Sequence, residues 1–311
     1  MNKILLPNGL KVSAAALGAM NFGTTVDKEK SFAILDKYVE LGGNFIDTSN
    51  NYAHWAGTGD ESETLLGEWI ASRGCRDKIV LATKVGFDRH GEGAGLHAQQ
   101  IEYWIDESLR KLRTDYVDLY YAHTDDMDTP IEETLEAFDR LIKKGKVRNI
   151  GASNFDTWRM SEANMTADIK GLTPYTVAQQ KFSYLQPRAE IAPKYTFNET
   201  TDRERLRYLE SKNIPLVAYA CLCKGGYEME ERMPEEFLKG ERYMLIKELA
   251  REKGVSASAL VIAWLSNLHR CDGYPQVLPL FSASPSHLEE NIRGLEIELT
   301  DEELERMNNA K

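Results

Sequence analysis

Gly43-Asn-Phe-Ile-Asp-Thr-Ser-Asn-Asn-Tyr52 is the stretch of this sequence that decides the fold. It begins as a short apolar run, Asn44 to Ile46, which indicates a buried strand. It then changes to small polar residues and places Asp47 and Tyr52 just beyond the strand end. A carboxylate and a phenol in a loop at the end of a strand suit the mouth of a catalytic site better than a core. The rest of the chain must supply the neighbouring strands and the partners of these two side chains.

Strand-like and helix-like segments alternate along the chain. Short apolar runs predict strands at 14–18, 44–46, 78–84, 117–123, 147–153, 176–180, 215–219 and 276–281. Apolar residues at helical spacing predict helices after Asp27 and near 60–70, 99–112, 130–144, 156–166, 201–211, 241–252, 256–267, 285–293 and 300–308. Eight β-then-α units predict an α/β fold, a closed (β/α)8 TIM barrel rather than an open sheet, with accessory helices. Asn8-Gly9 within residues 3–12 predicts an N-terminal β-hairpin.

Length and composition predict one domain over residues 1–311, without repeats or linkers. A net charge of −11 argues against nucleic acid or an anionic membrane surface as the main partner. The apolar run before Pro7 is too short for a signal peptide, and no stretch approaches the ~20 apolar residues of a membrane helix. The four cysteines lack zinc-site or disulfide-framework spacing, so we expect a reducing, cytoplasmic location.

Three neighbouring strands end in reactive side chains. The second ends at Asp47, with Tyr52 in its loop, the third ends at Lys84 and the fourth ends at His123. Because the carboxyl ends of barrel strands converge at one mouth, we expect these four side chains to lie together. Each alone has an ordinary structural interpretation, as a turn cap, a solvated charge or a structural histidine. Their shared position at three strand ends favours a common site.

This set of side chains suits one chemistry. A phenol has a reference pKa of about 10, and a nearby ammonium lowers it. We therefore expect Lys84 to lower the pKa of Tyr52, Asp47 to keep Lys84 charged and oriented, and His123 to bind a carbonyl oxygen. A tyrosine tuned in this way is an acid for carbonyl reduction and a base for alcohol oxidation. Since no side chain donates a hydride, a cofactor must supply it.

These residues belong to motifs by which the chain resembles the aldo-keto reductase family over nearly its whole length. The motifs are Phe45-Ile-Asp-Thr48 with Tyr52, Glu61-Ser-Glu-Thr-Leu-Leu-Gly67, Thr83-Lys84, Asp118-Leu-Tyr-Tyr-Ala-His123, Gly145-Lys-Val-Arg-Asn-Ile-Gly-Ala-Ser-Asn-Phe155, Gln179 with Phe182-Ser183, Ala218-Tyr219 and Glu290-Asn291. The resemblance implies a (β/α)8 barrel that uses NADP or NAD without a Rossmann domain. No G-x-G-x-x-G follows a predicted strand, which agrees with this. The resemblance also implies Tyr52 as acid/base, with Asp47, Lys84 and His123 as its partners.

The resemblance further implies where the cofactor binds. Ser153, Asn154 and Gln179 correspond to residues that hold the nicotinamide carboxamide, and Tyr219 to a ring that stacks on the nicotinamide. The other residues assigned to the cofactor by this resemblance are Gly18, Met20, Asp47, Ala220, Leu222, Lys224, Ser282, Ser284, His287, Glu290 and Asn291. Among these, Lys224 is expected to reach the pyrophosphate, and the two serines to donate hydrogen bonds.

Two departures from the family pattern affect the cofactor. Relatives have Ser-Pro-Leu after the stacking tyrosine, whereas this chain has Ala220-Cys-Leu-Cys-Lys224, whose two cysteines we expect to pack rather than react. Many NADPH-specific relatives carry a lysine near Phe281 and an arginine near His287, which clamp the 2′-phosphate. Both cations are missing here, which should weaken discrimination in favour of NADPH. NADP and NAD therefore both remain open, and His287 can still contact a phosphate.

The residues expected to line the substrate pocket are His54, Trp55, Asp126 and Tyr227. An aromatic wall beside carboxylates suits a polyhydroxylated compound such as a sugar or cyclitol. The same residues fit a solvated acidic loop equally well, and a pocket rich in tryptophan and tyrosine also suits an aromatic or aliphatic aldehyde. We expect a small-molecule carbonyl or polyol substrate, and either a monomer or a homo-oligomer.

Two other functional classes are compatible with this fold. One is a cofactor-binding regulatory protein with little or no catalysis, resembling potassium-channel β subunits. The other is a metal-dependent barrel hydrolase, which needs clusters of histidine and aspartate ligands at strand ends. The histidines outside the proposed catalytic set, His54, His90, His97, His269 and His287, form no such pairs. No metal is therefore predicted.

Overall fold

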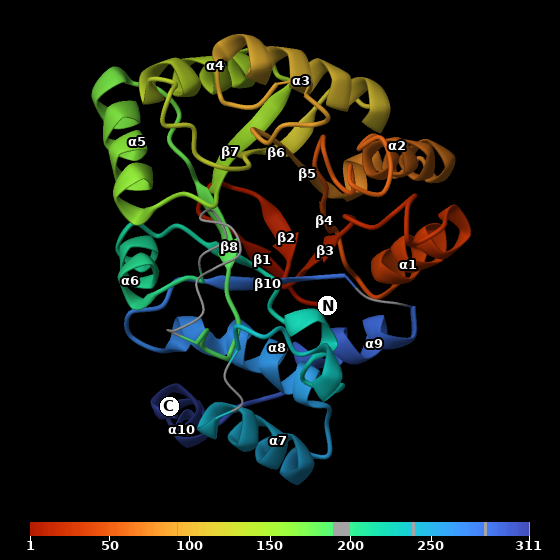
Figure 1. Cartoon of the computed structure of the whole chain (residues 1–311), viewed down its shortest axis with the longest axis vertical. Helices are drawn as coiled ribbons and strands as arrows, with labels where there is room; N and C mark the ends of the chain where they lie inside the picture. Colours follow the sequence, from red (N-terminus) through yellow and green to blue (C-terminus); the bar gives the residue numbers. More distant parts are fainter. Residues whose placement is uncertain (92, 189–199, 238–239, 283–284, 311) are drawn as a thin grey trace.

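A closed parallel barrel forms the centre of the computed structural model, which describes residues 1–311 except 92, 189–199, 238–239, 283–284 and 311 (Figure 1). Its strands are β3 (Ala16–Gly18), β4 (Phe45–Asp47), β5 (Val80–Val85), β6 (Val117–Ala122), β7 (Val147–Ser153), β8 (Val177–Lys181), β9 (Leu216–Tyr219) and β10 (Val277–Phe281). They are hydrogen-bonded in sequence order, and β10 pairs in parallel with β3 to close the ring. The predicted (β/α)8 barrel is confirmed.

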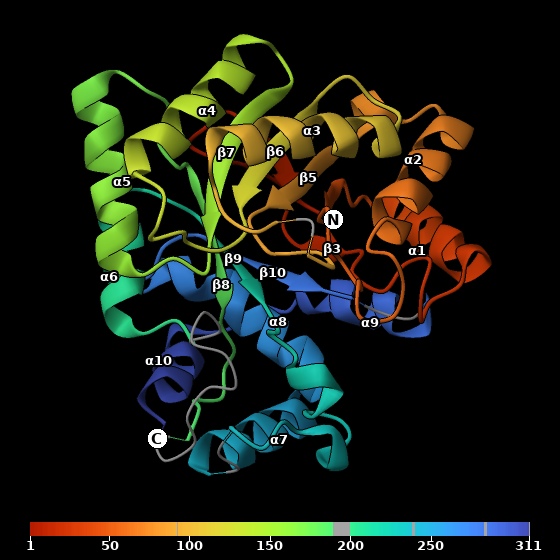
Figure 2. The same cartoon turned by 45° about the horizontal axis from the view of Figure 1, so that its top comes forward.

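Helices surround the barrel on its outside (Figures 1 and 2). They are α1 (Lys28–Glu40), α2 (Glu61–Arg73), α3 (Ala98–Leu112), α4 (Ile131–Lys143), α5 (Thr157–Lys170), α6 (Arg203–Ser211), α7 (Glu241–Lys253), α8 (Ala257–Asn267), α9 (Pro285–Gly294) and α10 (Asp301–Asn309). The connection from β9 to β10 contains both α7 and α8, and α10 follows the last unit. No helix in the described part of the chain has the length and apolar character needed to cross a membrane.

Local side chains fix where several helices begin. The carboxylate of Asp27 accepts a hydrogen bond from the backbone N–H of Lys30, which satisfies a donor that the first turn of α1 leaves free. Asp202 and Ser256 do the same for α6 and α8. At α10, Thr300 and Glu303 form a reciprocal capping box.

Two layers of apolar side chains hold the barrel together. The outer layer lies between the strands and the helices and includes Ile46, Leu81, Tyr120 and Ile150. The inner layer fills the barrel itself, with side chains that alternate along each strand with those of the outer layer. Its members are Ala16, Phe45, Val80, Ala82, Leu119, Tyr121, Val177, Val217, Leu278 and Leu280.

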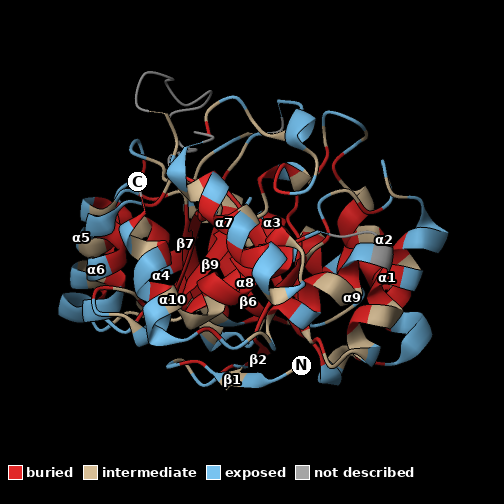
Figure 3. Ribbon diagram, turned by 90° about the horizontal axis from the view of Figure 1, so that it is seen from below, coloured by how far each residue is buried: buried red, intermediate tan, exposed pale blue. Residues whose placement is uncertain are grey.

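The N-terminal hairpin closes one end of the barrel. Strands β1 (Lys3–Leu5) and β2 (Lys11–Ser13) pair antiparallel, as the Asn-Gly turn predicts, and lie at the bottom of Figure 3. Leu6, Leu10 and Val12 are buried against the inner layer. The hairpin therefore covers the end of the barrel at which the strands begin, and leaves the other end to the connecting loops.

Candidate active site

The two-residue period of the strands brings polar side chains to the open end of the barrel. In β4, Phe45 packs inside the barrel, so Asp47, two residues later, also points inward. The same step leads from Val177 to Gln179 in β8 and from Val217 to Tyr219 in β9. In β5 it leads from Ala82 to Lys84, and in β6 it leads from Tyr121 to His123, just past the strand end. Alternation alone thus explains why residues distant in sequence share one inner surface.

Asp47, Tyr52 and Lys84 form one hydrogen-bonded cluster. The Tyr52 hydroxyl donates to Asp47 Oδ1 at 2.9 Å and accepts from Lys84 Nζ at 2.6 Å. Lys84 also donates to Asp47 Oδ1 at 2.5 Å and to the carbonyl of Thr48 at 2.7 Å. The second carboxylate oxygen of Asp47 accepts from Gln179 Nε2 at 2.8 Å. Asp47 and Lys84 are fully buried, so this ion pair is stabilised by its hydrogen bonds rather than by water.

The electrostatics of this cluster correct one expectation. Burial, and then the negative charge of Asp47, raise the pKa of Tyr52 well above its usual value of 10. Lys84 was expected to lower the pKa of Tyr52. The charge of its ammonium is balanced by the carboxylate of Asp47, and burial lowers the pKa of Lys84 itself. Tyr52 therefore remains protonated at neutral pH. In that state it is ready to give a proton, and it can take one only after it has lost its own.

His123 stands beside the phenol with its ring edge-on. Its ring centroid lies 5.8 Å from that of Tyr52 and 4.7 Å from that of Phe87. Burial, followed by the charge of Lys84, holds the pKa of His123 well below 6.5, so the ring is neutral. Its Nδ1 lies 3.1 Å from Ser49 Oγ. Sequence reasoning missed Ser49 and Phe87, although both lie within or next to the strand-end segments that were singled out.

The loop that carries Tyr52 is tied to its surroundings. The backbone N–H of Thr48 donates to Ala82 O at 2.9 Å, and the Thr48 hydroxyl shares a hydrogen bond with Ser62 at 2.7 Å. Arg89 donates to the carbonyl of Asn50 at 3.2 Å and forms an ion pair with Asp60. These contacts come from different strands and helices, so the phenol is held on a fixed frame.

Ser153, Asn154 and Tyr219 form a second polar row at the mouth. Asn154 adopts a left-handed backbone with φ of 58°, and its amide donates to Ser153 Oγ at 3.1 Å and to the carbonyl of His123 at 2.9 Å. The Tyr219 hydroxyl donates to Asn154 Oδ1 at 2.6 Å. The row contains both hydrogen-bond donors and acceptors, as a carboxamide requires.

The loop after β9 is a tight turn that leaves Lys224 on the surface. Ala220, Cys223 and Lys224 have positive φ values of 54°, 47° and 55°, and Gly225 continues the series at 86°. The turn is closed by its own hydrogen bonds, since Cys223 N donates to Ala220 O at 3.1 Å and Gly225 N donates to Leu222 O at 2.9 Å. Lys224 is exposed and Leu222 partly so. Contact between Lys224 and a pyrophosphate stays a prediction.

The two cysteines of this loop pack into the interior, as expected. Burial raises the pKa of the Cys221 thiol to about 12 and that of the Cys223 thiol to about 11. The Cys223 sulfur lies 3.3 Å from Ser183 Oγ. Both cysteines are therefore protonated and unreactive at neutral pH.

The remaining residues assigned to the cofactor have varied exposure. Gly18 and Glu290 are partly buried, Asn291 is buried, and Met20, Ser282 and His287 are exposed. Ser284 lies outside the described residues. Phe281 is buried, and as a phenylalanine it offers no charge to a phosphate.

The four residues assigned to the substrate pocket are in different environments. Trp55 is 65% exposed, and the ring of His54 contacts it edge-on at 5.3 Å. Asp126 instead stabilises its own surroundings, because it accepts hydrogen bonds from Leu96 N and from the Thr129 hydroxyl.

Tyr227 requires a correction, because it does not present an open aromatic wall. It is fully buried, and its hydroxyl interacts with Ser183 at 2.8 Å and accepts from Leu185 N at 3.1 Å. The phenol thereby joins the 182–188 segment to the loop after β9. Packing and hydrogen bonding, rather than substrate contact, account for its position.

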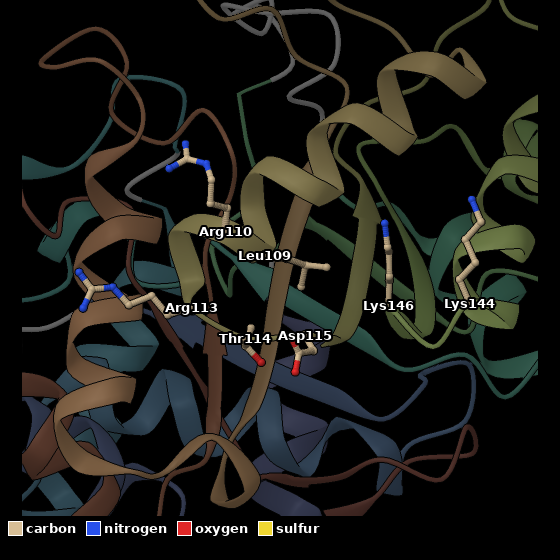
Figure 4. Close-up of a pocket in the computed structure, with 7 residues that line it drawn as sticks. All are labelled: Leu109, Arg110, Arg113, Thr114, Asp115, Lys144 and Lys146. Carbon is tan, nitrogen blue, oxygen red and sulfur yellow. The ribbon is translucent and has the colours of Figure 1, made fainter.

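A surface depression elsewhere on the molecule is not part of this cluster (Figure 4). It is lined by Leu109, Arg110, Arg113, Thr114, Asp115, Lys144 and Lys146. Asp115 lies two residues before β6 and Lys146 directly before β7, so the depression lies at the end of the barrel opposite Tyr52. Its cations are paired with acidic side chains, for example Arg110 with Glu107 at 2.7 Å. Within the described residues, no group of three or more His, Cys, Asp or Glu side chains is placed to hold a metal ion.

Comparisons with known proteins show what the chain as a whole is similar to. The sequence profile described as "Aldo/keto reductase family" matches residues 15–311. Norsolorinic acid reductase stcV of Emericella nidulans is 36% identical, over 97% of this chain and 79% of its own. Putative aryl-alcohol dehydrogenase AAD14 of Saccharomyces cerevisiae is 30% identical, over 96% of this chain and 82% of its own. The crystal structure of the thermostable aldo-keto reductase Tm1743 with the inhibitor epalrestat superimposes with a TM-score of 0.77 over 99% of both chains, at 25% identity.

Proposed function

The chain belongs to the aldo-keto reductase family and is an oxidoreductase, and we propose that it interconverts a carbonyl and an alcohol with Tyr52 as the acid/base. One observation carries this proposal. The Tyr52 hydroxyl accepts a hydrogen bond from a fully buried lysine and donates to a fully buried carboxylate at the open end of the barrel. A phenol held between a cation and an anion can lose its proton without large rearrangement.

In reduction, Tyr52 gives its proton to the oxygen of the substrate. Lys84, already 2.6 Å from the phenol oxygen, stabilises the phenolate that remains, and Asp47 keeps the ammonium in place. Neutral His123 holds the carbonyl oxygen through Nε2. A nicotinamide, when bound, supplies the hydride, and Ser153, Asn154, Gln179 and Tyr219 would hold its carboxamide and ring. In oxidation the same residues act in reverse order.

We propose that the substrate carries an aromatic ring. The relatives named above include a norsolorinic acid reductase and an aryl-alcohol dehydrogenase. At the mouth, Trp55 and the neighbouring His54 offer flat surfaces on which a ring can stack. Asp126 uses its carboxylate within the protein, which weakens the case for a sugar or cyclitol. A panel of aryl aldehydes, aliphatic aldehydes and polyols, followed by cofactor absorbance in both directions, separates these classes.

The cofactor proposed is NADP or NAD, with no strong preference. His287 is exposed near the start of α9, and the family's cationic clamp for a 2′-phosphate is missing around it. Fluorescence titration with NADPH and NADH measures the preference. A preference for NADPH of about several hundredfold, which corresponds to more than 3 kcal/mol, contradicts the proposal.

Tyr52→Phe tests the proposed role of the phenol. It removes one oxygen, so we expect the turnover number for carbonyl reduction to fall by about 10²- to 10⁴-fold while cofactor affinity is retained. Tyr103→Phe, which removes the phenol oxygen of a residue exposed on α3, is the matched control and should keep full activity. Unchanged reduction in Tyr52→Phe refutes the assignment. A wild-type protein that binds cofactor but reduces no carbonyl in the panel favours the regulatory class instead.

A further inference from the structure

Ser49 is fully buried in the loop between Asp47 and Tyr52, and its hydroxyl oxygen lies 3.1 Å from His123 Nδ1. We propose that Ser49 is a positioning residue whose O–H direction selects the tautomer of His123: donation to Nδ1 leaves the ring hydrogen on Nε2, where it can face the substrate oxygen. This inference rests on the proposed function, because it concerns how His123 holds the carbonyl.

The Ser49 oxygen is held in place by the backbone on both sides. Thr48 N donates to Ala82 O at 2.9 Å, and Asn50 N donates to Lys84 O at 3.4 Å. The backbone of Asn50 is also held through its carbonyl by Arg89. Ser49 is thus fixed between the ends of β4 and β5, and the orientation of its O–H is the main freedom that it keeps.

A neutral imidazole has one N–H, and its two nitrogens take opposite roles. If Ser49 donates its hydrogen to Nδ1, then Nε2 must carry the ring hydrogen and can donate to a carbonyl oxygen. If Nδ1 carries the hydrogen and donates to Ser49, then Nε2 is a bare acceptor and repels a carbonyl oxygen. The low pKa of His123 keeps the ring neutral, so these two states exhaust the possibilities at neutral pH.

Asn51 competes for the single hydrogen of Ser49. Its Oδ1 accepts from Ser49 Oγ at 2.8 Å, a shorter distance than the 3.1 Å between Ser49 Oγ and His123 Nδ1, and Asn50 Oδ1 is a weaker acceptor at 3.5 Å. When Ser49 donates to Asn51, it can only accept from His123, which fixes the wrong tautomer for carbonyl binding. The hydroxyl orientation of Ser49 therefore chooses between a carbonyl-binding ring and a ring that accepts hydrogen bonds. A carbonyl substrate, which cannot donate, binds only the first.

Two substitutions should act in opposite directions. Ser49→Ala removes the donor to Nδ1, so we expect kcat/KM for carbonyl reduction to fall about tenfold, as for the loss of one well-placed hydrogen bond, with cofactor affinity unchanged. Asn51→Ala removes the competing acceptor, so the KM for the carbonyl should fall, with cofactor affinity unchanged. Ser31→Ala is the matched control, since it removes an equally buried hydroxyl, which donates to the carbonyls of Val26 and Asp27.

The tautomer itself is observable by ¹⁵N NMR of the protein labelled at histidine, without cofactor or substrate. The signals of His123 are identified by their loss in His123→Gln. We expect Asn51→Ala to move them toward the Nε2–H form and Ser49→Ala to change the tautomer ratio, whereas Ser31→Ala leaves the signals in place. Unchanged signals and unchanged kcat/KM in Ser49→Ala overturn the inference. Absence of carbonyl reduction in the wild type would instead overturn the proposed function, while the spectra still decide the role of Ser49.

Discussion

At the scale of single residues, the ion pair of Lys84 and Asp47 affects both stability and the proposed catalysis. Both side chains are fully buried, and each is the nearest opposite charge to the other. A buried pair of this kind contributes little net stability, but breaking it leaves one charge unpaired in a low dielectric. Stability and catalysis therefore depend on the same atoms and can be separated only by changing both partners.

Lys84→Met should destabilise the protein by about 3–5 kcal/mol, because it leaves Asp47 as an uncompensated buried charge. The double variant Lys84→Met with Asp47→Asn should recover much of this loss, since neither side chain is then charged. Both variants should lack carbonyl reduction. Urea unfolding measures the stabilities, and a double variant no more stable than the single one would show that charge is not the cause.

The pKa of His123 gives a second prediction, on stability against pH. In the unfolded chain the imidazole titrates near 6.5, whereas in the folded protein its pKa is well below that value. Below pH 6.5 the unfolded state therefore binds more protons than the folded state, so His123 makes stability fall as the pH falls. His123→Gln should lose less unfolding free energy than wild type between about pH 7 and about pH 5. Parallel losses in the two proteins would contradict this.

At the scale of elements, the contact between α2 and α3 depends on one glycine. A Cβ added at Gly67 would lie 2.0 Å from the carbonyl oxygen of Lys111, which is a backbone atom and cannot move alone. The sequence marked Gly67 only as part of a family motif, because the close approach involves a helix that lies more than 30 positions further along the chain. The physical reason became visible only once the two helices were placed together.

Gly67→Ala tests whether helix propensity or the close contact with α3 dominates, because the two change the free energy of unfolding in opposite directions. Helix propensity alone predicts stabilisation by about 1 kcal/mol. The clash with Lys111 predicts destabilisation by about 1–3 kcal/mol, as for an overpacked core. We expect the second result in urea or thermal unfolding. A more stable Gly67→Ala protein would mean that α2 and α3 can separate at small cost.

Element boundaries were largely predictable because alternation and caps are local signals. The strand that ends at Asp47 and the helix that begins after Asp27 follow from their own residues. The predicted direction of the Tyr52 pKa shift was wrong, because the shift depends on burial and on the balance of charges, which only the folded site defines. Tyr227 was misassigned for a related reason: a tyrosine in a long loop gives no sign that the loop folds back over it.

At the scale of the whole molecule, the barrel closes through the pairing of its first and last strands, Ala16 with Leu280 and Leu17 with Phe281. Residues proposed to hold the cofactor follow several strands of the ring, including β3, β7, β9 and β10. A bound dinucleotide would therefore connect parts of the chain that are far apart in sequence. That one domain spans residues 1–311 stays a prediction.

Cofactor binding should accordingly raise the thermal stability of the entire chain. At a concentration of about 100 times its dissociation constant, a ligand stabilises by about 2.7 kcal/mol, which corresponds to a rise of roughly 4 °C for a chain of this length. NADPH and NADH at equal multiples of their dissociation constants should give equal shifts in a thermal melt. A melt in which only part of the structure shifts would contradict unfolding as one unit.

The hairpin of β1 and β2 covers the barrel at the end opposite Tyr52. Leu6, Leu10 and Val12 are buried against the inner layer of the barrel. In the described part of the chain, we therefore expect no passage for substrate or water below Tyr52. Substrate, product and the proton that converts the phenolate back to the phenol should then all pass through the open end of the barrel. We therefore expect release of the product to come before water can reprotonate Tyr52.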